Sequence, residues 1–117
     1  MIPKFRAFIK KENKIRNVTT IDFTLKIIEC LNGVLEYEFE YVVLMQSTGL
    51  KDKNGVEIFE GDIGWDDHQE VHGQVIFENG AFKYEWENIS EDLFEVTDDI
   101  EIVGNIYENS ELLEEAE

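Results

Sequence analysis

The residues best suited to chemistry lie in one short segment, residues 66–72. It holds two aspartates, a glutamate and the chain's only two histidines, His68 and His72. Histidines four residues apart share one face of a helix, as in many metal sites. This segment, however, runs into a predicted strand, where His68 and His72 would lie about 13 Å apart at ~3.3 Å per residue. A solvated loop is therefore favoured over a metal site.

Cys30 is the only cysteine, so neither an intramolecular disulfide nor a cysteine-based zinc cluster is possible. A nucleophilic role beside a histidine is conceivable, but its place at the end of a predicted hairpin favours a packed small residue. Phosphate-binding glycine loops, the nucleophile elbow and EF-hand spacing are all missing. We therefore expect no catalytic, metal-binding or cofactor-binding residues and no cofactor, and an enzyme is the least favoured class.

A second candidate site is formed by aromatic residues of the second half of the chain. In small barrels such residues sometimes line a peptide-binding groove, although they more often form the core. The core is the preferred interpretation, and the groove stays open as an alternative. The residues are Trp65, Phe82, Tyr84, Trp86 and Tyr107.

Charge is distributed very unevenly along the 117 residues. The net charge is −17, from 27 acidic and 10 basic residues. Residues 1–58 carry a net charge of +1 and residues 59–117 a net charge of −18, while residues 1–16 alone carry +5. Such acidity disfavours nucleic-acid binding by the second half. The basic start either packs against the acidic half of the same chain or drives self-association between chains.

Targeting signals are not evident in the sequence. The first residues lack the apolar stretch of a signal peptide, and no window approaches the ~18 consecutive apolar residues of a membrane helix. We therefore expect a cytoplasmic protein with no membrane partner.

The strongest local signal is Asn-Gly, which favours type I′ hairpin turns and occurs at residues 32–33, 54–55 and 79–80. Around the third pair, alternating apolar residues predict that Phe77 faces Phe82 and Val75 faces Tyr84. Gly73 would then lie opposite Trp86 and leave room for its indole.

The remaining pattern predicts further strands and few helices. The first Asn-Gly pair joins arms 21–31 and 34–44, with Ile28 facing Tyr37 and Cys30 facing Leu35. The second is expected in an exposed turn. Residues 5–9 and 99–107 form a first and a last strand, the last with a bend at Gly104. The acidic tail 110–117 either begins a short helix or frays. A small antiparallel barrel or sandwich follows.

Three stretches of the chain resemble the YopX family of phage and prophage proteins. They are residues 2–7 (IPKFRA), 44–63 (LMQSTGLKDKNGVEIFEGDI) and 98–109 (DDIEIVGNIYEN). The resemblance covers nearly the whole chain, with Ser110 as a departure where proline is expected. It implies a protein of phages or prophages of Gram-positive bacteria, an SH3-like second half, and a location in the host cytoplasm. It carries over no catalytic or binding residue, and Gly49, Gly55 and Gly61 fit a structural role as backbone-geometry positions.

We therefore expect a mainly β protein in three parts. Residues 1–43 form a basic strand and a β-hairpin, residues 44–109 an SH3-like barrel, and residues 110–117 an acidic tail. The favoured function is a non-enzymatic accessory protein that forms homo-oligomers and binds a host or phage protein. The alternative is an acidic DNA mimic that inhibits a host nucleic-acid-binding protein.

Overall fold

A computed structural model describes residues 4–114, which form two compact units, divided between Gln46 and Ser47. Within the described residues there are strands and short 3-10 turns, so the expected mainly β fold is confirmed. The units divide after Gln46, three residues beyond the boundary expected from the sequence. No described segment forms a helix that is long and apolar enough to cross a membrane.

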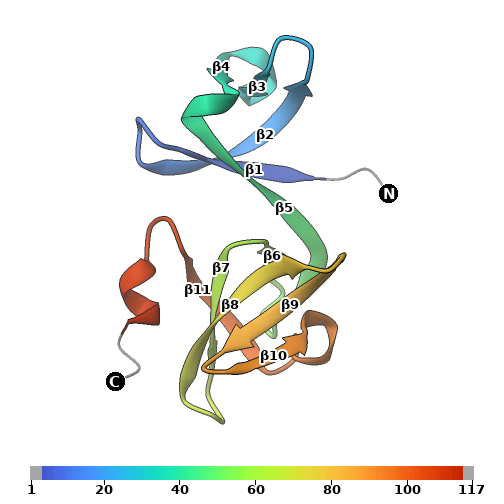
Figure 1. The fold of residues 1–117 in the computed structure, drawn as a ribbon, viewed down its shortest axis with the longest axis vertical. Coiled ribbons are helices and arrows are strands. Elements are labelled where there is room, and N and C mark those ends of the chain that lie inside the picture. The colour runs from blue at the N-terminus through green and yellow to red at the C-terminus, as the bar shows by residue number, and fades with distance from the viewer. Residues whose placement is uncertain (1–3, 115–117) are drawn as a thin grey trace. The chain divides into compact units, whose positions relative to one another are not determined.

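The first unit is an antiparallel sheet with the strand order β4-β3-β2-β1-β5 (Figure 1). Its strands are β1 (Phe5–Ile9), β2 (Lys14–Asp22), β3 (Ile27–Cys30), β4 (Leu35–Glu38) and the first half of β5 (Val42–Lys51). Its core is made by buried apolar residues that alternate along β1 and β3, together with the first residue of β5. They are Ala7, Ile9, Ile28, Cys30 and Val42.

The hairpin at Asn32-Gly33 is present but shorter than expected. Ile28 pairs with Tyr37 and Cys30 with Leu35, as the sequence predicts. The outgoing arm, however, is interrupted at residues 23–26, because the Asp22 carboxylate accepts hydrogen bonds from the backbone N–H groups of residues 24 and 25 and closes a turn. The returning arm is interrupted by the 3-10 turn at Phe39–Tyr41. Residues 14–20, for which no strand was expected, belong to β2.

The second unit contains a five-stranded antiparallel sheet with the order β10-β9-β8-β7-β11. Its strands are β7 (Asp62–Asp66), β8 (Val71–Glu78), β9 (Ala81–Trp86), β10 (Ile89–Asp92) and β11 (Ile100–Asn105), and β6 (Glu57–Phe59) pairs with the second half of β5. The end strands β10 and β11 do not pair with each other, so the sheet is barrel-like but open. Its core is completed by the 3-10 turn η3 (Leu93–Glu95). The buried core residues are Ile58, Val75, Tyr84, Leu93, Val96 and Ile100.

The β8–β9 hairpin confirms the predicted register. Phe77 faces Phe82 and Val75 faces Tyr84, and both Asn79 and Gly80 have positive φ as a type I′ turn requires. The bend at Gly104 is also confirmed, as a register shift in β11. The Asn54-Gly55 turn is exposed, as expected, but only Gly55 has positive φ.

The space above Gly73 is filled by Tyr84, and the expectation that it accommodates Trp86 is wrong. A Cβ atom on Gly73 would lie 2.4 Å from Cζ of Tyr84, and one on Gly64 would lie 2.9 Å from its hydroxyl oxygen. The phenol ring therefore crosses two neighbouring strands at the points where they lack side chains. Because Tyr84 is 1% exposed, this packing closes the centre of the unit's core.

The variant Gly73→Ala tests this packing. Its methyl group would displace a buried ring, so we expect a loss of about 1–3 kcal/mol in the free energy of unfolding. Urea denaturation followed by fluorescence measures it, with Gln74→Ala as the neighbouring control on the other face of β8. An unchanged midpoint in Gly73→Ala would show that the ring does not occupy this space.

Candidate functional site

The two histidines occupy different elements of the second unit. His68 is exposed in the turn between β7 and β8, where its backbone N–H donates to the Asp66 carboxylate over 2.8 Å. His72 lies on β8 opposite Trp65, with the two ring centres 4.7 Å apart. Across residues 4–114 there is no group of three or more histidine, cysteine, aspartate or glutamate side chains placed to hold a metal ion.

Cys30 lies in the core of the first unit and is 1% exposed. Burial raises the pKa of its thiol, which lowers the fraction of reactive thiolate at neutral pH. Both histidines belong to the second unit. The structure thus places Cys30 as a packing residue.

The aromatic residues considered for a groove have different roles. Tyr84 is in the core, and Phe82 and Trp86 pack against that core. Trp86 also donates from Nε1 to the Glu91 carboxylate over 2.7 Å. Of the five, Trp65 lines a surface concavity in the second unit.

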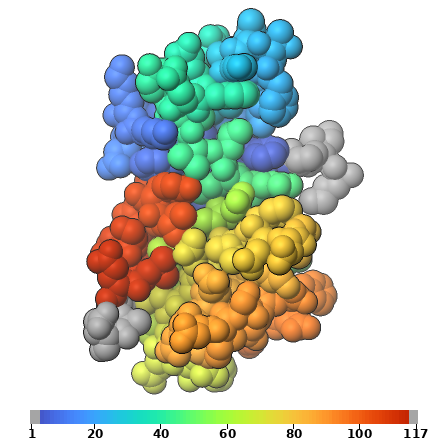
Figure 2. All heavy atoms as spheres, in the orientation of Figure 1, coloured from blue at the N-terminus to red at the C-terminus, as the bar shows by residue number. Residues whose placement is uncertain are grey.

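This concavity, called here the Trp65 pocket, has a volume of about 310 Å³. Its walls come from β7, β8, the β7–β8 turn, the β9–β10 turn and the C-terminal 3-10 turn η4 (Ser110–Leu113), which contacts β8. Figure 2 shows the C-terminal segment (red) against the strands of the second unit. The lining residues are Trp65, Glu70, Val71, His72, Glu87, Leu112 and Leu113.

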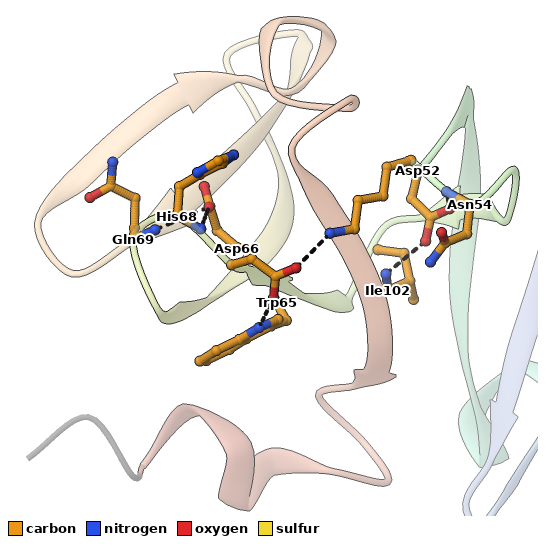
Figure 3. Close-up of polar contacts among 9 residues, drawn as sticks. Asp52, Asn54, Trp65, Asp66, His68, Gln69 and Ile102 are labelled. Carbon is orange, nitrogen blue, oxygen red and sulfur yellow. Dashed lines mark hydrogen bonds and ion pairs between the residues drawn. The ribbon is translucent and has the colours of Figure 1, made fainter.

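Trp65 is held by a short polar chain that joins two turns (Figure 3). Its Nε1 donates to Asp67 over 2.5 Å, and the other oxygen of Asp67 accepts from Lys53 over 2.9 Å. The Lys53 ammonium and the Trp65 N–H lower the pKa of Asp67, and Asp67 in turn raises the pKa of Lys53. Because the Lys53 and Asp67 side chains are at the surface, these contacts orient the indole of Trp65 more than they stabilise the fold.

Lys53 is positioned by its neighbour Asp52, a residue that is 6% exposed. One oxygen accepts from the N–H groups of Asn54 and Val56, and the other accepts from Ile102 on β11 over 2.8 Å (Figure 3). The Lys53 N–H also donates to the Ile100 carbonyl over 3.1 Å. The turn between β5 and β6 thereby covers the outer edge of β11.

Residues 44–63, which carry much of the family resemblance, thus make largely structural contacts, as their glycines suggested. Gly49, Gly55 and Gly61 all have positive φ. The hydroxyl of Thr48 donates to the Ile58 carbonyl, and the Asp62 carboxylate accepts from the Phe59 N–H. Sequence reasoning did not single out Asp52 or Lys53, although an aspartate two residues before Asn-Gly is a recognisable Asx-turn signal.

A larger hollow of about 650 Å³ lies in the first unit, beside the β1–β2 turn. At its edge, Glu12 accepts from the Tyr37 hydroxyl over 2.6 Å and from Arg16 over 2.8 Å. These two hydrogen bonds lower the pKa of Glu12. The hollow carries both charge signs, since its lining includes two lysines and three glutamates. The residues are Ile9, Lys10, Lys11, Glu12, Glu36, Tyr37, Glu38 and Tyr41.

The substitution Asp52→Asn tests the anchoring of the Lys53 turn. Burial raises the pKa of Asp52, but the backbone hydrogen bonds outweigh it and the net pKa is lowered. A carboxylate whose pKa is lower in the folded state than in the unfolded state stabilises the fold at pH values above its unfolded pKa. This stabilisation is lost as the pH falls through the folded-state pKa. We expect Asp52→Asn to cost about 2 kcal/mol at neutral pH, and less in acid.

Urea unfolding at several pH values down to about pH 3 measures this difference. Asp98→Asn, an exposed carboxylate of the same unit, is the control and should leave stability unchanged. A cost that is the same at every pH would contradict an ionised, hydrogen-bonded Asp52.

Comparisons with known proteins agree with these features. The family model described as YopX protein matches residues 4–114. The crystal structure of protein EF1440 from Enterococcus faecalis is similar, with a TM-score of 0.74 and 33% sequence identity over 97% of this chain and 99% of that chain. Among curated proteins, no match was found. The chain therefore belongs to the YopX protein family.

Proposed function

We propose that the protein is a phage or prophage accessory protein, a non-enzymatic protein-interaction module that self-assembles in the bacterial cytoplasm. The observation that carries this proposal is the separation of charge between the two units. Residues 1–46 contain seven basic and six acidic residues, whereas residues 47–117 contain three basic and twenty-one acidic residues. Unlike surfaces on one chain attract each other across copies of that chain.

The second unit neutralises little of its own charge. Its lysines Lys53 and Lys83 are each paired internally, with Asp67 and Asp92. With three basic residues against twenty-one acidic ones, the unit keeps a large net negative charge. A cationic partner surface would therefore lower the electrostatic free energy of this unit.

The basic side of the first unit is concentrated at the turn that connects β1 and β2. Lys10, Lys11 and Lys14 are all exposed there. The one acidic residue in this segment, Glu12, is engaged by Tyr37 and Arg16. The turn therefore presents net positive charge to solvent.

A DNA mimic is the second candidate function, and the same acidity motivates it. Mimicry requires carboxylates spaced like phosphates on one exposed face. Asp52 and Asp62 are buried and accept backbone hydrogen bonds, so they are unavailable for such a face. Their burial removes only these two carboxylates from such a face, so the experiment below is designed to separate the two functions.

Sedimentation velocity at several protein and salt concentrations tests self-assembly. We expect oligomers at about 0.1 M salt that dissociate towards about 1 M, because the Debye length falls from ~10 Å to ~3 Å over this range. A monomer at every protein and salt concentration would overturn self-assembly. Retention of a nucleic-acid-binding protein from host lysate by that monomer would favour the mimic instead.

A further inference from the structure

The Trp65 pocket has the chemistry of a site for a basic side chain. Trp65 and His72 provide aromatic surface, and Val71 and two leucines of η4 provide apolar surface. Glu70 and Glu87 add carboxylates at the same concavity. A lysine combines a charged head with an apolar stem, so it matches such a mixture of aromatic, apolar and acidic groups.

The carboxylates of this pocket are available to a ligand. Glu70 and Glu87 are both exposed, and neither side chain has an ion pair or hydrogen bond within residues 4–114. Asp67, by contrast, is already held by Lys53. A volume of about 310 Å³ is at the lower end for ligand sites, which suits one or two side chains rather than a large cofactor.

The β1–β2 turn of the first unit has the complementary charge. The chain reverses there through hydrogen bonds from the N–H groups of Glu12 and Asn13 to the Ile9 carbonyl, which leaves Lys11 at the tip. Lys10 donates to the Glu40 carbonyl over 3.1 Å. Lys11 and Lys14 make no side-chain hydrogen bond or ion pair within the described chain.

We propose that the Trp65 pocket binds the β1–β2 turn of a second copy of this chain, with Lys11 and Lys14 facing Glu70 and Glu87. This proposal rests on the self-assembly proposed above and names its contact. The two surfaces differ, so the contact is heterologous and each bound copy still offers one free turn and one free pocket. Assembly then proceeds head to tail, into a ring or a filament.

Two variants, each defective in one surface, test this contact. Lys11→Ala/Lys14→Ala removes the basic turn but keeps the pocket, and Glu70→Lys/Glu87→Lys reverses the pocket but keeps the turn. All four residues are exposed, and Glu70 and Glu87 already have positive φ, which lysine tolerates as well as glutamate. Equal urea midpoints confirm that both variants remain folded.

We expect each pure variant to be monomeric under conditions in which the wild type assembles, a weakening of at least about tenfold in the dissociation constant. An equimolar mixture of the two should form a 1:1 heterodimer and nothing larger, because one intact turn and one intact pocket remain. Sedimentation velocity measures both results. Matched controls change the same charges elsewhere, namely Lys26→Ala/Lys51→Ala and Glu78→Lys/Asp98→Lys, and should assemble like the wild type.

The outcomes separate this contact from self-assembly in general. Wild-type oligomers that both variants still form would overturn the pocket contact and leave the proposed function in place. Loss of assembly in both variants without a heterodimer in the mixture would also overturn it. In a head-to-tail contact, the intact pocket of one variant must bind the intact turn of the other. Assembly lost equally in the controls would show that only net charge matters, which contradicts a specific pocket. A monomeric wild type would remove the proposed function as well.

Discussion

The second unit depends on one buried carboxylate, that of Asp52. It accepts three backbone hydrogen bonds, two from its own turn and one from Ile102, fifty residues later in the chain. This interaction fixes the β5–β6 turn against β11 and satisfies N–H groups of both. Lys53 then reaches Asp67, and Asp67 orients Trp65. The binding surface that we propose is therefore built on a contact that is itself structural.

Charge provides the second organising constraint. The second unit contains a large excess of carboxylates. Asp52 and Asp62 are buried, and each accepts backbone hydrogen bonds that hold the local chain in place. The remaining ones are mostly exposed, where they attract cations. Aromatic and apolar groups beside Glu70 and Glu87 distinguish the Trp65 pocket from this general acidity, because they add contacts that salt does not screen.

The sequence was sufficient where structure is local. The Asn79-Gly80 turn and its alternating arms predicted the register of β8 and β9, which is confirmed. The sequence was insufficient where the local structure depends on a hydrogen bond or packing contact that the apolar pattern does not show. The alternation of apolar residues around Asp22 continues through a turn, so it concealed the break between β2 and β3. The hydrogen bond from the Ile102 N–H to Asp52 joins segments fifty residues apart that no periodicity relates. Alternation gives the register of β8 and β9, but it does not show that the Tyr84 ring fills the space over Gly73.

The central claim is that the basic turn of one copy binds the Trp65 pocket of another. Carbodiimide coupling of an equal mixture of ¹⁴N- and ¹⁵N-labelled protein tests it directly, because this reagent joins lysines to carboxylates that touch. Mass spectrometry should find peptides that link Lys11 or Lys14 to Glu70 or Glu87 and carry one label from each copy. Linked peptides that carry a single label only, or none at these residues, would contradict the account.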